Sequence, residues 1–145
     1  MTRSADELVE EARQRIVRVS PAQLGGVVEA GGLIIDIRPR HQRIEEGAFP
    51  GAIVIDRNVL EWRLDPRGEF RIPQVTGYDQ PIVIVCSEGY ASSLAAASLT
   101  DLGFSFASDL DGGYKAWELW INDESVIELD AYRNQLRNAR VARKA

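Results

Sequence analysis

One cysteine stands where an α/β protein would carry a nucleophile. The continuous apolar run Pro81–Val85 ends at Cys86, and a short polar loop then leads into an alanine-rich helical segment. The helix directs its unpaired N–H groups and its positive dipole end back at that loop, which favours a thiolate and holds an anion. Gly89 lets the loop curl so that several N–H groups converge. We interpret Cys86 as a thiolate nucleophile whose loop could hold an anionic persulfide or oxyanion.

A cysteine at a strand end can also be a small buried residue without reactivity, and its position alone does not separate the two interpretations. The loop and the helix that follow it favour the reactive one. Little else in the sequence offers chemistry. His41 is the only histidine and lies in a polar segment where we expect it to be exposed. One cysteine and one histidine are too few for a thiolate or imidazole zinc site, so we expect no metal.

Hydrophobic runs and turn residues predict the elements that position the loop. Apolar runs predict strands over 17–19, 33–37, 52–55, 81–85 and 106–110. Helical spacing predicts helices over 4–15, 20–30, 59–64, 92–102, 113–120 and from 125 onward. We expect Asn58 to cap the short helix over 59–64 and Trp62, Trp117 and Trp120 to lie in the core. Strands that alternate with helices predict an α/β fold, with a parallel sheet covered on both faces.

The chain length of 145 residues fits one domain. We expect a core over about 17–120, an additional N-terminal helix, and a C-terminal helical extension over 121–145. In that extension Leu129, Tyr132 and Leu136 share a helix face. This face would either cover the domain or form a dimer seam, and the sequence leaves both open.

Composition limits the partners and the compartment. The net charge of −5 argues against nucleic acid as a partner, and we interpret the basic stretch 137–144 as the end of a helix. The chain starts with charged residues and has no apolar run of roughly 20 residues, so we expect neither a targeting segment nor membrane contact. A single cysteine excludes an internal disulfide, and together these features predict a cytoplasmic protein.

Four sequence pieces, in order, resemble the rhodanese-like superfamily. They are the aspartate-x-arginine strand end 35–38, the glycine-x-x-proline-glycine-alanine turn 46–52, the cysteine-x-x-glycine loop 86–90 and the leucine-x-glycine-glycine-x-x-alanine-tryptophan segment 110–117. The resemblance implies a five-stranded parallel sheet and transfer of sulfane sulfur through a Cys86 persulfide without a metal or organic cofactor. It implies a small donor such as thiosulfate and a thiol or protein acceptor.

The resemblance also implies which residues bind the donor. The loop residues are Ser87, Glu88, Gly89, Tyr90, Ala91 and Ser92. Arg38 is expected in a structural ion pair with Asp36 near the loop. Arg57 and Arg63 would lie near the pocket mouth and supply charge, or else belong to a solvated helix face. Tyr90 would point to a partner, shape the entrance or pack on the sheet.

Two departures from the family pattern leave two possible functions open. Many single-domain relatives end the loop with arginine, where this chain has Ala91, and the missing arginine also argues against a phosphatase. Glu88 adds a negative charge that should disfavour the thiolate and weaken binding of a dianion. The sequence therefore predicts either a sulfurtransferase or a weakly active carrier or protein-binding module that keeps the fold.

Overall fold

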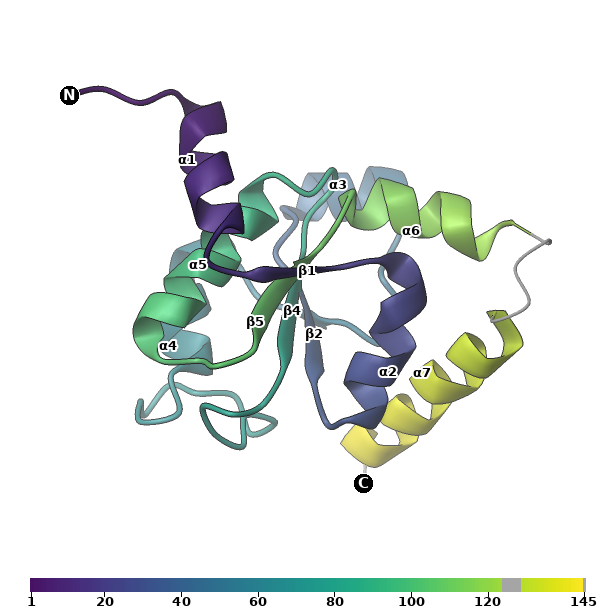
Figure 1. Cartoon of the computed structure of the whole chain (residues 1–145). Helices are drawn as coiled ribbons and strands as arrows, with labels where there is room; N and C mark the ends of the chain where they lie inside the picture. Colours follow the sequence, from purple (N-terminus) through teal and green to yellow (C-terminus); the bar gives the residue numbers. More distant parts are fainter. Residues whose placement is uncertain (124–128, 145) are drawn as a thin grey trace.

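The computed structural model describes residues 1–123 and 129–144, and its centre is a parallel sheet of five strands in the order β1-β5-β4-β2-β3. The strands are β1 (Val17–Val19), β2 (Leu33–Asp36), β3 (Ile53–Val54), β4 (Ile82–Val85) and β5 (Ala107–Leu110). Every predicted strand is therefore present, and the predicted α/β class is confirmed. The strand before Cys86, β4, is the central one (Figure 1).

Helices connect the strands and cover both faces of the sheet. They are α1 (Ala5–Arg13), η1 (Pro21–Gln23), α2 (Leu24–Glu29), α3 (Arg40–Glu46), η2 (Arg57–Val59), α4 (Leu60–Leu64), α5 (Ala91–Leu102), α6 (Gly113–Ile121) and α7 (Leu129–Lys144), of which η1 and η2 are 3-10 turns. Within the described residues, none of these helices has the length and apolar character to cross a membrane.

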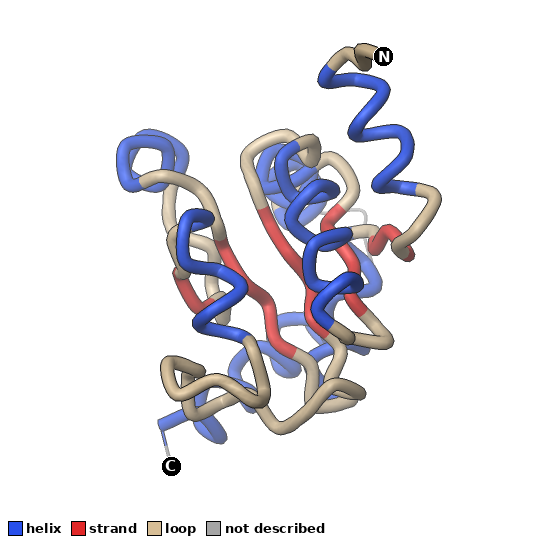
Figure 2. Tube along the Cα trace, turned by 90° about the vertical axis from the view of Figure 1, so that its left-hand side faces the viewer, coloured by secondary structure: helices blue, strands red, loops and turns tan. Residues whose placement is uncertain are grey.

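The two faces of the sheet bury alternate residues of the same strands. On β4, Ile82 and Ile84 pack with residues of α4 and α5, whereas Val83 and Val85 pack with residues of α2, α6 and α7. All four side chains are fully buried, as a parallel strand covered on both faces requires. Figure 2 shows helices on either side of the strands. Cys86 continues the side of Ile82 and Ile84 and belongs to the cluster beneath α5.

The C-terminal helix α7 lies against α2 (Figure 1), and its Tyr132 contacts Trp117 and Trp120 of α6. Tyr132 and Leu136 are buried there, and Trp117 Nε1 donates to the Tyr132 hydroxyl at 2.7 Å. Of the two interpretations that the sequence left open, this face therefore covers the domain. The predicted helix start at Ser125 and the side chain of Leu129 lie outside the described residues.

Two local expectations are wrong. Asp56, not Asn58, caps the turn before α4, since the Asp56 carboxylate accepts from the Asn58 N–H at 2.8 Å. Trp62 is 60% exposed rather than buried. The helix α4 is short and turns Leu60 and Leu64 inward, one helical turn apart, so the position between them faces solvent. Trp117 is buried and Trp120 packs half-buried beside it, as expected.

The start of α6 lies directly against the Cys86 segment. Gly112 and Gly113 have φ values of 76° and 65°, in the left-handed region that other residues avoid. A Cβ on Gly113 would lie 2.5 Å from the backbone oxygen of Cys86. Glycine at this position lets α6 approach the loop.

We expect Gly113→Ala to lower the free energy of unfolding by about 2 kcal/mol or more, because it combines left-handed strain with a backbone clash. Urea unfolding followed by circular dichroism measures the change. Gly26→Ala in α2 is the matched control. A Cβ there meets nothing within 4 Å, so the variant should be unchanged or more stable by up to about 1 kcal/mol. Equal stabilities for both variants would contradict the close approach at Gly113.

Candidate active site

Cys86 follows β4 directly and its sulfur is held by the turn into α5. Its side chain is 7% exposed. The backbone N–H groups of Gly89 and Ser92 donate to Cys86 Sγ, at 3.2 and 3.3 Å. Since α5 begins at Ala91, one of these donors belongs to the first turn of the helix, where N–H groups lack helical partners. The structure thus brings two backbone N–H groups to the sulfur, where such donors can bind an anion.

Gly89 makes this curl of the loop possible. Its φ is +87°, in the left-handed region. A Cβ there would lie 2.8 Å from the Gly112 nitrogen and 3.2 Å from Arg18 Nη2. Both the backbone conformation and the space around it therefore require glycine.

The N-terminus of α6 holds the carbonyl side of the loop. Tyr114 N donates to the Cys86 oxygen at 2.8 Å, and Lys115 N donates to the Ser87 oxygen at 3.1 Å. These two carbonyls satisfy N–H groups that the first turn of α6 cannot pair within the helix. The orientation of the peptides beside the sulfur is thus fixed by backbone contacts.

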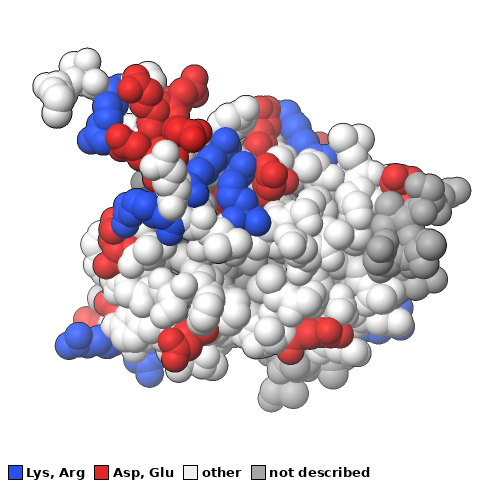
Figure 3. Space-filling view, viewed as in Figure 1, with Lys and Arg blue, Asp and Glu red and all other residues white. Residues whose placement is uncertain are grey.

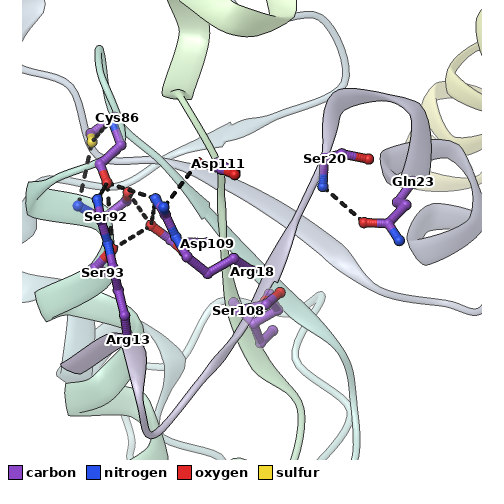
Figure 4. A network of polar contacts seen from close by, with 12 residues as sticks. Arg13, Arg18, Ser20, Gln23, Cys86, Ser92, Ser93, Ser108, Asp109 and Asp111 are labelled. Atoms are coloured by element: carbon purple, nitrogen blue, oxygen red, sulfur yellow. Dashed lines mark hydrogen bonds and ion pairs between the residues drawn. The ribbon is translucent and has the colours of Figure 1, made fainter. Parts of the chain in front are cut away.

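A buried carboxylate holds the first turn of α5. Asp109 on β5 has no exposed surface, and its Oδ2 accepts from the Ser92 hydroxyl at 2.7 Å and the Ser93 hydroxyl at 2.8 Å. Arg18 Nε on β1 donates to Asp109 Oδ1 at 3.0 Å and neutralises the charge. Figure 4 shows these side chains converging behind Cys86. A buried carboxylate needs such partners, because an unpaired one would be costly.

Two arginines reach the loop from elements that precede it by more than 70 residues. Arg13 Nη2 on α1 and Arg18 Nη2 on β1 each donate to the Gly89 carbonyl oxygen at 2.8 Å. Arg13 Nε also donates to Ser93 Oγ at 3.1 Å, and its guanidinium lies 5.4 Å from the centre of the Tyr90 ring. Basic side chains gather where α1 meets β1 (Figure 3).

A second polar network lies on the other side of Cys86. The expected ion pair of Arg38 with Asp36 is present at 2.8 Å, and Arg38 is enclosed. Arg38 also donates to Glu46 at 3.1 Å, and Glu46 Oε2 accepts from the Ser87 hydroxyl at 2.6 Å. The Tyr114 ring stacks on the Arg38 guanidinium at 4.2 Å. This network joins β2 and α3 to the loop, so Arg38 supports the loop through Glu46 and Ser87.

An exposed ion pair lies beside the loop. Glu88 Oε1 accepts from Lys115 Nζ at 2.8 Å, and this carboxylate raises the pKa of Lys115. The sequence pointed to Glu88 but not to its partner on α6. The negative charge of Glu88 is therefore offset locally. Tyr90 and Ala91 are exposed next to it, and Tyr90 packs on Arg13 rather than on the sheet.

Two of the predicted residues lie apart from the loop. Arg57 donates to both oxygens of Glu61, at 2.9 and 3.0 Å, and Arg63 donates to the Phe70 carbonyl at 2.6 Å. Among the contacts of the described residues, neither arginine touches the Cys86 loop. Their contacts hold the α4 region.

The sequence did not single out Arg13, Arg18 and Asp109. The last two carried a signal, since each is a charged residue inside a short apolar strand that the sequence predicted. Such a residue needs a buried partner of opposite charge. Arg13 carried no comparable signal, because it lies at the end of an amphipathic helix where arginine is common.

Glu46 gives a test of the second network. Burial opposes its charge, but the hydrogen bonds from Ser87 and Arg38 outweigh burial and hold the pKa of Glu46 below the ordinary 4.5. A carboxylate with a lowered pKa stabilises the fold above its unfolded pKa and loses that contribution as the pH falls through its folded pKa. We expect Glu46→Gln to lower the free energy of unfolding by about 1 kcal/mol at pH 7. The difference from wild type should shrink below about pH 4.5.

Urea unfolding at several pH values between 7 and 3 measures both effects. Glu45→Gln is the matched control, because Glu45 is the exposed neighbour on the same helix. A loss of stability that is the same for both variants, or that grows toward low pH, would contradict the role given to Glu46.

Comparisons with known proteins agree with this architecture. The family model described as a rhodanese-like domain matches residues 20–119. The thiosulfate sulfurtransferase GlpE of Pseudomonas savastanoi pv. phaseolicola is 29% identical over 109 residues, which are 75% of this chain and 93% of that protein. The GlpE protein of Stutzerimonas stutzeri is 31% identical over 100 residues, covering 69% of this chain and 83% of its own length.

Solved structures show the same fold. A protein of unknown function from Rhodopseudomonas palustris, named as a "possible tyrosine phosphatase", superposes with a TM-score of 0.73 at 27% identity over 83% of this chain and 92% of its own. The human single-domain sulfurtransferase superposes with a TM-score of 0.58 at 24% identity over 70% and 95% of the two chains. With a family model that covers most of its length, this chain belongs to the rhodanese-like domain family.

Proposed function

We propose that the protein is a sulfurtransferase that moves sulfane sulfur from thiosulfate or a persulfide donor to a thiophilic acceptor through a Cys86 persulfide. The observation that carries the proposal is the pair of backbone N–H donors on Cys86 Sγ at the N-terminus of α5. They favour the thiolate before the reaction and a negatively charged outer sulfur after it. The relatives named thiosulfate sulfurtransferase support the choice of donor.

In the first step the Cys86 thiolate attacks the outer sulfur of thiosulfate. A bond forms between Cys86 Sγ and that sulfur, the bond between the two thiosulfate sulfurs breaks, and sulfite leaves with the electron pair. The product is a Cys86 persulfide anion. In the second step an acceptor thiolate, or cyanide in an assay, attacks the outer sulfur, and the Cys86 thiolate leaves. Two successive displacements predict ping-pong kinetics.

The loop needs little rearrangement during this cycle. Gly89 N and Ser92 N already point at the sulfur. Around them, α6 holds the Cys86 and Ser87 carbonyls, the two arginines hold the Gly89 carbonyl, and Asp109 holds the Ser92 hydroxyl. Donors fixed before the reaction stabilise developing charge without a cost of reorganisation at the moment of transfer. Cys86 is largely shielded from water, which protects a persulfide from competing chemistry.

The alternative is a carrier or protein-binding module with little turnover on small donors. Ala91 and Glu88 favour it, because the loop itself presents no cation to a dianion and one carboxylate instead. Such a module would take sulfur from a protein partner or dock onto it. It differs from the enzyme in its reaction with free thiosulfate.

A phosphatase is less compatible with this loop, although one structural neighbour carries that name. Phosphate transfer calls for a bidentate arginine that faces the anion. Ala91 occupies that position, and the Nη2 groups of Arg13 and Arg18 are engaged by the Gly89 carbonyl. Absence of p-nitrophenyl phosphate hydrolysis would agree with this reading.

Incubation with thiosulfate should add one sulfur atom to the protein. We expect intact mass spectrometry to show a gain of about 32 Da that dithiothreitol reverses, because the persulfide is a covalent intermediate. Cys86→Ser removes the only thiol and should show no gain. The same Ser variant should unfold at nearly the wild-type urea concentration, since the replacement is close in size.

The outcome separates the two candidates. A folded wild-type protein that reacts with iodoacetamide but gains no sulfur from thiosulfate would contradict the thiosulfate-dependent enzyme. A glutathione persulfide donor would then test the carrier reading with the same mass measurement.

Glu88→Gln should raise kcat/KM for thiosulfate by about two- to fivefold at low salt, because it removes a negative charge and frees the Lys115 ammonium to face the dianion. Lys115→Gln should lower it by a similar factor, and the double variant should return close to wild type. Steady-state thiocyanate formation measures all three. A gain in Glu88→Gln that persists unchanged in 1 M salt would contradict the electrostatic explanation.

A further inference from the structure

The contacts of Arg13 differ from those of its basic neighbours. Arg3 pairs with Glu11, Arg15 with Asp101 and Arg18 with Asp109 and Asp111. Within residues 1–123 and 129–144, Arg13 forms no ion pair. Its partners are the Gly89 carbonyl, the Ser93 hydroxyl and the Tyr90 ring, all of them neutral. A half-buried positive charge therefore lies against the loop without a bound carboxylate to cancel it.

Hydrogen-bond stoichiometry fixes how Arg13 is held. The Ser93 hydroxyl has one proton and lies 2.8 Å from Asp109 Oδ2 and 3.4 Å from the Gly89 oxygen, and the nearer, charged carboxylate is the stronger acceptor. The Ser93 oxygen is then free to accept from Arg13 Nε at 3.1 Å. Asp109 thus orients Ser93, and Ser93 orients Arg13 toward Gly89. Figure 4 shows Arg13, Ser93 and Asp109 in this order below Cys86.

The hydrogen bonds of the two arginines to Gly89 O determine the orientation of the peptide between Gly89 and Tyr90. A trans peptide is planar, with its C=O and N–H groups pointing to opposite sides. Since two arginine Nη2 groups hold the Gly89 oxygen at 2.8 Å each, the Tyr90 N–H must point away from the arginines. The preceding N–H of Gly89 is on Cys86 Sγ. The arginines therefore set the direction of the Tyr90 amide, the peptide that follows the Gly89 donor, and place positive charge beside the loop.

We infer that Arg13 and Arg18 are positioning residues for sulfur transfer, which supply from behind the loop the cationic support that Ala91 does not supply from within it. The inference rests on the proposed function for the nature of the reaction. Arg18 lies on β1, one of the five strands of the sheet, whereas Arg13 lies on α1, before the match to the family model at residue 20. The helix α1 thus adds a contact to the active-site loop.

A purely structural role explains Arg18 but not Arg13. Arg18 must neutralise the buried Asp109, and its bond to Gly89 O could be a by-product of that task. Arg13 has no carboxylate to neutralise, and α1 already packs on α5 through Val9 and Ala12. Its two hydrogen bonds go to the loop and to the first helical turn that carries the loop donors.

Charges on every surrounding element act on the Cys86 thiolate together with Arg13. The pKa of Arg18 is lowered by burial but raised more strongly by Asp109, Asp111 and Cys86, so Arg18 keeps its positive charge beside the loop. The other groups are paired within their own networks and stay unchanged in an Arg13 variant. They are Asp109 with Arg18 on β5 and β1, Glu88 with Lys115 on the loop and α6, and Asp36 with Arg38 and Glu46 on β2 and α3.

The test is the pH profile of Cys86 alkylation by iodoacetamide in Arg13→Gln. Iodoacetamide is uncharged and Cys86 is the only thiol, so the rate reports the thiolate directly. We expect the pH midpoint to rise by about 0.5 unit through loss of the nearby cation. In the thiosulfate assay kcat/KM should fall about tenfold, because a charged hydrogen bond to the loop is lost.

Matched variants separate charge, packing and folding. Arg13→Lys keeps the charge and should have a midpoint closer to wild type than to Arg13→Gln. Arg15→Gln removes a neighbouring arginine that pairs with Asp101 at the far end of α5, and should change neither midpoint nor kcat/KM. Arg13→Met is a second neutral variant that keeps the side-chain stem, so that a folding defect of one replacement leaves the other to decide.

The results distinguish failure of the inference from failure of the proposed function. A folded Arg13→Gln or Arg13→Met with the wild-type midpoint and the wild-type kcat/KM overturns the inference, as does an Arg15→Gln midpoint that moves equally. A midpoint that moves in a protein that takes up no sulfur from thiosulfate sustains the positioning role and removes thiosulfate as donor. Alkylation needs no sulfur donor, so the two answers are independent.

Discussion

The buried carboxylate of Asp109 is the constraint on which the site depends. It lies inside β5 with no exposed surface and is satisfied only because two other elements bring donors to it. The Ser92 and Ser93 hydroxyls come from the first turn of α5, and Arg18 comes from β1. A buried charge with fixed partners allows few alternative arrangements, and removing one partner is strongly unfavourable. Satisfying Asp109 therefore also sets the start of α5, from which the loop receives its donors.

The loop around Cys86 is held on all sides by groups whose own requirements are met there. The N–H groups at the start of α6 donate to the Cys86 and Ser87 carbonyls. The Ser87 hydroxyl donates to the Glu46 carboxylate. The Gly89 carbonyl accepts hydrogen bonds from the two arginines. What remains free to point at the sulfur is a set of backbone N–H groups. A site of this kind is preorganised because the scaffold, and not the substrate, has already fixed the direction of its dipoles.

The sequence predicted what is local and missed what is distant. The strand before Cys86, the glycine in its loop and the alanine-rich helix after it follow from periodicity and turn residues, which act over a few positions. The errors at Asn58 and Trp62 are also local, because one turn of helix offers too few positions to define its cap or its buried face. Arg13 contacts Gly89 across 76 positions and Arg18 contacts Asp109 across 91. No spacing rule predicts such contacts, although a charged residue inside an apolar strand indicates that one exists.

The Glu88–Lys115 ion pair and the Arg13 guanidinium differ in how strongly water and neighbouring charges screen their electric fields. Glu88 and Lys115 are both more than half exposed, so water and salt screen their effect on a dianion, and they cancel each other in part. Arg13 is half-buried, packs on Tyr90 and has no carboxylate partner among the described residues, so less of its field is lost. A half-buried cation behind the loop can therefore act on the sulfur more effectively than one that is exposed and paired with a carboxylate. Under the proposed function, that difference would let a loop that ends in alanine hold an anionic persulfide.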